Sequence, residues 1–131
     1  METLILSSDD VRRLVAHVGL HTLMDDMISC LTAGFQSFNP EDTAVPARSG
    51  FMYDHPDPGL LEWMPCRRSS GQATIKVVGY HPGNPRNKGL PTILSTVSAY
   101  DTTTGHLVCM MDGTLITALR TGAASAVATG V

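Results

Sequence analysis

Residues 73–100 read ATIKVVGYHPGNPRNKGLPTILSTVSAY, and their pattern indicates the class of the fold. They contain two runs of β-branched and apolar residues, Ala73–Val78 and Thr92–Tyr100, on either side of the polar, turn-rich segment His81–Gly89. Runs of this composition that are bounded by Gly, Pro and Asn are typical of β-strands. The middle of the chain is therefore predicted to form strands rather than helices.

Working outward, similar apolar runs occur on both sides of this stretch, at Val45–Phe51, Leu60–Met64 and Leu107–Met111. Clusters of turn-forming residues separate them, at positions 55–59, 67–71 and 101–105. Parallel strands need a long crossover, usually a helix, whereas antiparallel strands do not. The short connections therefore favour an antiparallel meander over a series of βαβ units.

Helical periodicity is found only towards the two ends of the chain. Ser7–Asp10 offers capping groups before a first helix, and Gly19 is predicted to end that helix. A second apolar stripe runs at helical spacing from Leu20 to Phe38, and a third helix with a face of small residues is predicted from Thr114 onward. The expected fold is α+β, with two N-terminal helices, a mostly antiparallel β-sheet and a C-terminal helix in a single domain over residues 1–131.

Composition excludes several classes of protein. The chain has 131 residues, of which 43% are hydrophobic and 16% charged, so it is not a charge-rich disordered protein. The net charge of −3 provides no basic field for nucleic acid or an anionic membrane. No run approaches the ~20 apolar residues of a membrane span, and no signal peptide is recognised. Three widely spaced cysteines favour a reducing compartment. We therefore expect a cytoplasmic protein.

Several catalytic and cofactor motifs are absent from the sequence. There is no G-x-G-x-x-G turn, no P-loop and no Ser-His-Asp arrangement that spacing alone supports. His17, His21 and Asp25 are spaced by four, but Gly19 is expected to break the helix between them, so no metal site is predicted. From the residues alone, the catalytic group is unknown.

Three isolated cations stand in otherwise apolar or uncharged surroundings: Arg48, Lys76 and Arg120. Lys76 interrupts the apolar run Ile75–Val78, where it either lies on a solvent-facing side or needs an anionic partner. Arg120 is the only charge between Asp112 and Val131, and a guanidinium can bind a carboxylate or phosphate through two hydrogen bonds. Taken alone, Arg48 is explained equally well by a surface salt bridge.

The sequence over roughly residues 45–131 resembles the N-terminal part of the ornithine cyclodeaminase/μ-crystallin family. The resemblance depends on seven stretches in the family's order: Val45–Arg48, Glu62–Pro65, Ile75–Val78, Lys88–Ile93, Thr104–Gly105, Met111–Gly113 and, the most specific, Thr117–Ala126. Residues 1–44 match only as a pattern of two opening helices.

The resemblance implies an NAD(P)-linked enzyme of small amino acids and cyclic imines. The family's type reaction converts ornithine into proline with loss of ammonia, by hydride removal from Cα, cyclisation and return of the hydride. Position by position, the resemblance implies that Arg48 and Lys76 hold the substrate carboxylate. It also implies that Thr92 and Arg120 reach the cofactor, with Arg120 close to the substrate as well.

The family's Rossmann domain, with its glycine fingerprint and catalytic aspartate, would lie beyond Val131. The sequence is therefore expected to provide the substrate-binding and dimer-forming domain, needing a companion Rossmann domain for activity. We expect Arg48, Lys76 and Arg120 to line one electropositive cleft. Two alternatives remain: a non-catalytic small-molecule-binding or dimerisation module, and a cofactor-free lyase or cyclase that uses the same cleft.

Overall fold

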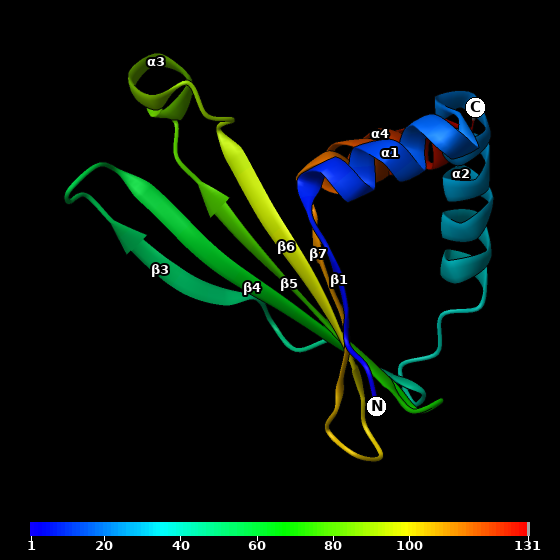
Figure 1. The fold of residues 1–131 in the computed structure, drawn as a ribbon. Helices are drawn as coiled ribbons and strands as arrows, with labels where there is room; N and C mark the ends of the chain where they lie inside the picture. The colour runs from blue at the N-terminus through cyan, green and yellow to red at the C-terminus, as the bar shows by residue number, and fades with distance from the viewer. Residues whose placement is uncertain (131) are drawn as a thin grey trace.

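A computed structural model describes residues 1–130 (Figure 1). Four helices and seven strands follow one another along the chain. Their bounds are β1 Leu4–Leu6, α1 Ser8–Val18, α2 Leu20–Gln36, β2 Thr43–Ala44, β3 Ser49–Tyr53, β4 Gly59–Arg68, β5 Gln72–Tyr80, α3 Asn84–Lys88, β6 Ile93–Asp101, β7 Leu107–Asp112 and α4 Thr114–Thr129. Among these described residues, no helix has both the length and the apolar character needed to cross a bilayer.

The strands form one sheet in the order β1-β7-β6-β5-β4-β2, with β3 also paired to β4. Every neighbouring pair is antiparallel except β1 and β7, which run parallel. The predicted α+β class, with its mostly antiparallel sheet between N-terminal helices and a C-terminal helix, is confirmed. The parallel strand β1, the two-residue strand β2 and the short helix α3 are additions to the predicted elements, and the strand predicted at Val45–Phe51 is found at Ser49–Tyr53.

The helix boundaries follow the capping signals. The Ser7 hydroxyl caps α1 by accepting from the Asp10 amide, and the Asp10 carboxylate accepts from the Ser7 amide, which completes a capping box. Hydrogen bonds from Ser7 lower the pKa of Asp10 to about 2. Gly19 has φ +90°, a conformation that side chains disfavour, and it separates α1 from α2 as predicted.

Strand β4 continues through Pro65, where the sequence analysis had ended it at Met64. Proline lacks an N–H group, so it is tolerated only where no neighbouring strand needs that donor. On one side of β4, β3 pairs with residues 59–63 and β2 with residues 67–68, which leaves Pro65 in the gap between them. On the other side Pro65 is in register with Ile75 of β5.

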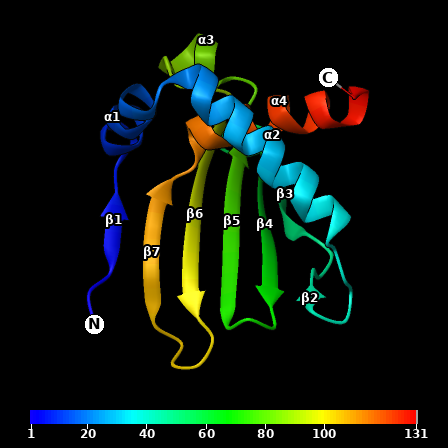
Figure 2. The ribbon, with the colours of Figure 1, turned by 90° about the vertical axis from the view of Figure 1, so that its right-hand side faces the viewer.

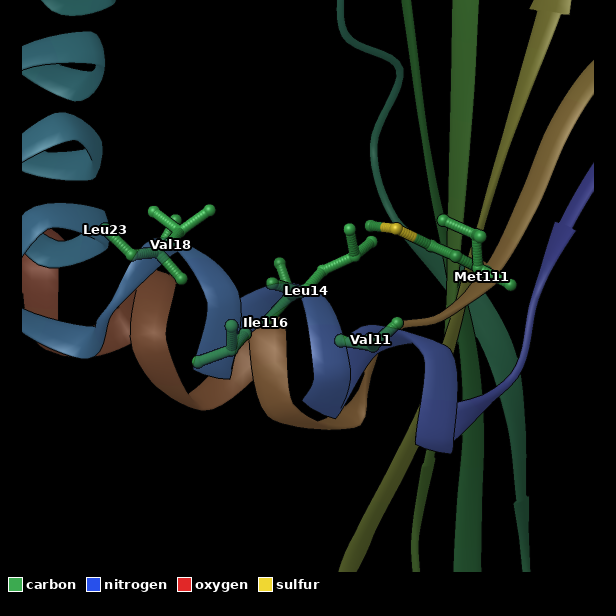
Figure 3. A pocket seen from close by; sticks show the side chains of 8 residues that line it. Val11, Leu14, Val18, Leu23, Met111 and Ile116 are labelled. Carbon is green, nitrogen blue, oxygen red and sulfur yellow. The ribbon is translucent and has the colours of Figure 1, made fainter.

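The three long helices all lie on the same side of the sheet, with α1 and α4 running outward from the strands and α2 packed against those two helices (Figures 1 and 2). α4 crosses close to α2 because its residues are small: a Cβ added at Gly122 would come within 3.8 Å of Met24 Cε. Within residues 1–130, Val11 and Ala123 are the two apolar residues that are fully buried. Beside Val11, a cavity of about 120 Å³ lies between α1, α4 and β7; its wall includes Leu14, Met111 and Ile116 (Figure 3).

The opposite face of the sheet carries no helix. It has an open groove of about 400 Å³, lined by residues of β4 to β7 that include Leu61, Val77 and Leu94. Leu61, Leu94 and Phe51 on this face are exposed, and Phe51 packs edge-on against Trp63 with ring centroids 5.3 Å apart. The sheet therefore has one side facing the helices and one apolar side facing solvent.

Candidate functional site: a cluster of three cations

Lys76 lies on the face of the sheet that carries the helices. In the strand register it stands between Met64 of β4 and Val97 of β6, and side chains of paired residues point to the same side of a sheet. Val97 borders α4, because a Cβ added at Gly113 would lie 3.0 Å from Val97 Cγ2. Lys76 is half-buried. Lys76 therefore lies on the side of the sheet that carries the helices, partly open to solvent.

Arg120 reaches the same region from α4. Its helix is joined to β6 one turn earlier, where the Thr117 and Ser95 hydroxyls lie 3.1 Å apart. Residues three apart on a helix are neighbours on its surface, so Arg120 follows Thr117 on the side near the sheet. The Arg120 side chain is exposed, and its positive charge is close enough to lower the pKa of Lys76.

Arg48 approaches from the residue immediately before β3. Its Nη1 lies 3.7 Å from Oε2 of Glu62, which is a long ion pair between a largely exposed arginine and a more buried glutamate. Glu62 lies two residues before Met64 in β4, so both side chains face the helices. Arg48, Glu62 and Lys76 therefore occupy adjoining strands on one face.

Electrostatics link the three cations directly. The pKa of Lys76 is lowered first by burial, then by the charge of Arg120 and then by that of Arg48. Within residues 1–130 neither Lys76 nor Arg120 takes part in an ion pair. Positive groups that repel one another without a counter-ion favour an anion placed between them. A carboxylate would accept charge-assisted hydrogen bonds from all three.

Glu62 is the member of this group that the sequence analysis missed as a site residue. It is the only acidic residue within β4, and an acid inside an apolar strand is the same kind of signal that singled out Lys76. The Glu62 carboxylate can accept hydrogen bonds from an ammonium group beside the three cations. The three cations and Glu62 therefore carry charges opposite to those of an amino acid's carboxylate and ammonium groups.

Thr92, which the resemblance assigns to the cofactor, stands apart from the cluster. It lies between α3 and β6, half-buried, and its carbonyl oxygen accepts a hydrogen bond of 2.8 Å from the His81 amide. Tyr80 pairs with Ile93, so His81 and Thr92 lie beyond the last paired residues of β5 and β6. No interaction in the described residues connects Thr92 with the three cations, and its role stays a prediction.

One other cluster of polar side chains occurs within residues 1–130, where the Tyr53 hydroxyl lies 2.8 Å from His81 Nε2 near the ion pair of Asp57 and Lys88. His17 and His21 are exposed on the separate helices α1 and α2, and among residues 1–130 no three His, Cys, Asp or Glu side chains come together as a metal site. Cys30, Cys66 and Cys109 are free thiols. The cation cluster is thus the strongest candidate site in the described part of the chain.

Known proteins share both the sequence and this fold. Residues 8–130 match the ornithine cyclodeaminase/mu-crystallin family. The chain is 42% identical over 130 residues to an L-lysine cyclodeaminase of Streptomyces rapamycinicus, which covers 98% of this chain and 38% of that protein.

Two solved structures are similar as well. The first shows lysine cyclodeaminase recognising L-lysine, L-ornithine and L-2,4-diaminobutyric acid. It has 48% identity and a TM-score of 0.86, and covers 96% of this chain and 37% of the other. The second is an archaeal alanine dehydrogenase dimer with bound NAD, with 34% identity, a TM-score of 0.76, and coverage of 95% and 35%.

This chain therefore spans less than two fifths of the length of these relatives. The match nevertheless extends over nearly all of residues 1–131 and agrees in sequence and in three dimensions. The chain belongs to the ornithine cyclodeaminase/mu-crystallin family, and what it matches is the N-terminal part of that family's proteins.

Proposed function

We propose that this chain is the substrate-binding domain of an NAD(P)-dependent cyclodeaminase or imine reductase that acts on a small amino acid. The observation that carries the proposal is that Arg48, through its ion pair with Glu62, and Lys76 lie on the same side of neighbouring strands, with the charge of Arg120 near Lys76. The structure of lysine cyclodeaminase with diamino acids supports an amino acid as the ligand class. Conversion of ornithine into proline and ammonia is the reaction that we put first.

In this proposal the three cations bind the substrate carboxylate, and Glu62 accepts a hydrogen bond from a substrate amino group. Arg48 then joins the two halves of the site, because it already forms an ion pair with Glu62. Binding both ends of the amino acid fixes the orientation of Cα. That orientation is what hydride transfer to or from Cα requires, and it lowers the entropic part of the barrier.

The residues described here fit the substrate and not the nucleotide. The helices lie on one face of a mainly antiparallel sheet, and no G-x-G-x-x-G turn joins a strand to a helix. A dinucleotide-binding domain needs that turn and a parallel βαβ unit. We infer that a Rossmann domain, in a companion chain or otherwise joined to this one, binds NAD(P), with Thr92 and Arg120 reaching towards it. A cytoplasmic location remains part of the proposal.

Calorimetric titration of the 131-residue chain at low ionic strength tests the ligand class. L-Ornithine or L-proline is expected to bind, whereas NAD⁺ alone is not. Ammonia release from ornithine with NAD⁺ present should be undetectable, because the chain has no nucleotide cradle. Binding of NAD⁺ without an amino acid, turnover by this chain alone, or no binding of any amino acid would each contradict the proposal.

We also propose that two copies of the chain associate through the helix-free face of the sheet. A monomer would expose Phe51, Leu61 and Leu94 around an open apolar groove, and large exposed apolar patches usually mark an interface. That the similar archaeal alanine dehydrogenase is a dimer supports the association of two copies.

Sedimentation velocity tests this association. The wild-type chain is expected to sediment as a dimer, and Leu94→Arg as a monomer, because a charge in the groove cannot be desolvated without a partner. Leu20→Arg is the matched control, since Leu20 is also an exposed leucine but lies at the start of α2, on the side of the sheet that carries the helices. A monomeric wild type, or a dimer that Leu94→Arg leaves intact, would argue against this interface.

A further inference from the structure

Three hydrogen bonds between the start of α4 and the sheet are formed by one residue of β6. Ser95 is 5% exposed and uses its amide, its carbonyl and its hydroxyl towards the start of α4. Its carbonyl accepts from the Gly113 amide at 2.7 Å, and its amide donates to Thr114 Oγ1 at 3.1 Å. Its hydroxyl lies 3.1 Å from Thr117 Oγ1. All three partners lie at the N-terminal end of α4 or just before it.

Close packing makes this junction specific. A Cβ added at Gly113 would lie 2.6 Å from Ser95 Oγ, so the chain enters α4 with no spare room above β6. Of the three hydrogen bonds, the one between Ser95 and Thr117 reaches furthest along the helix. The Ser95–Thr117 hydrogen bond is formed one turn before Arg120. It therefore fixes the rotation of α4 about its own axis, and its position relative to β6, at that turn.

We propose that Ser95 and Thr117 are positioning residues, whose hydroxyl contact holds Arg120 over the sheet next to Lys76. The remaining hydroxyls of α4 serve a different purpose. Thr121, Ser125 and Thr129 donate to carbonyl oxygens of their own helix, at 2.7, 3.1 and 3.0 Å. The inference rests on the proposed function in that Arg120 is taken to bind the substrate carboxylate.

The test uses Thr117→Val, which keeps the branched shape and removes the hydroxyl, and Ser95→Ala, which removes the same contact from the strand side. Ser98→Ala is the matched control on β6: Ser98 is 9% exposed and donates to the Ile75 carbonyl, but it is in register with Met110 and lies on the helix-free face. Ser125→Ala is the matched control on α4.

The first measurement is an NMR titration of the Lys76 side chain. In Thr117→Val and Ser95→Ala, the pKa of Lys76 is expected to rise towards its ordinary value, because Arg120 no longer lies close enough to disfavour the charged form. Thr117→Ser should restore the wild-type titration, and both controls should match the wild type. The pKa of Lys76 depends on its distance from Arg120, so this titration follows the position of Arg120 without a bound ligand.

The second measurement is the affinity for L-ornithine. Each of the two variants is expected to weaken binding about threefold to tenfold, as loss of one neutral hydrogen bond at a binding group does. The double variant should be no weaker than either single variant, since both remove one shared contact.

The two measurements separate the two proposals. If the wild type binds no amino acid, the proposed function fails, while the Lys76 titration still decides the role of Ser95 and Thr117. If Thr117→Val does not fold, Ser95→Ala tests the same contact. An unchanged Lys76 titration in a folded Thr117→Val or Ser95→Ala variant would overturn the positioning role.

Discussion

Lys76→Met is expected to weaken the binding of L-ornithine by roughly tenfold to hundredfold, the range for losing a charge-assisted hydrogen bond. Methionine is similar in length and fits the half-buried position between Met64 and Val97, so the fold should be retained. Removing the lysine charge also relieves its repulsion with Arg48 and Arg120. The variant should therefore be at least as stable as the wild type while it loses affinity, and calorimetry together with urea unfolding measures both effects.

Lys88→Met is the matched control, because Lys88 is the chain's other lysine. It is exposed and forms an ion pair of 2.5 Å with Asp57 beside α3, away from the cluster. Exposed pairs of this kind contribute about 0–1 kcal/mol to stability, so little should change. If Lys76→Met bound ornithine as tightly as Lys88→Met, the three-cation site would have to be abandoned.

Gly50→Ala is expected to destabilise the fold by about 2–4 kcal/mol, at the upper end for single substitutions. Gly50 is in register with Glu62, and a Cβ there would lie 2.2 Å from the Leu61 carbonyl oxygen and 2.8 Å from Glu62 Cα. Both are backbone atoms that a rotamer change cannot move. The added methyl group must displace β3 from β4, which would also move Arg48 at the start of β3.

Urea unfolding and amide exchange in β3 measure this effect, with Gly34→Ala as the control. Nothing lies within 4 Å of a Cβ at Gly34, which is inside α2, so alanine there should stabilise the helix by about 0.5–1 kcal/mol. A Gly50→Ala variant with wild-type stability and wild-type protection in β3 would show that the β3–β4 pairing is looser than the structure indicates.

The elements that the sequence predicted are those with strong local signals. The capping box at Ser7, the break at Gly19 and the long apolar stripe of α2 depend on near neighbours in sequence. β1 and α3 lack such signals. β1 has three residues and exists through its pairing with residues 109–111 of β7, while α3 is a five-residue helix within a polar loop. Distant contacts decide such short elements, which local propensity cannot describe.

The candidate site shows the same division. Isolated charges in apolar segments pointed to Lys76 and Arg120, and the structure brings their charges together. The side of the sheet on which Lys76 lies depends on the register of β4, β5 and β6, which alternation in one strand does not fix. Glu62 was missed because its value as a site residue comes from Arg48 across the β3–β4 pair, a contact absent from either segment alone.

The parallel pairing of β1 with β7 has a consequence for biosynthesis. Leu4 is in register with Cys109, so β1 is synthesised well before the strand that it pairs with. The intervening hairpins can form during translation, since their partners are near in sequence, whereas closure of the β1 edge cannot. Until β7 is available, Leu4 and Ile5 form an unpaired apolar segment that can associate with other exposed apolar segments.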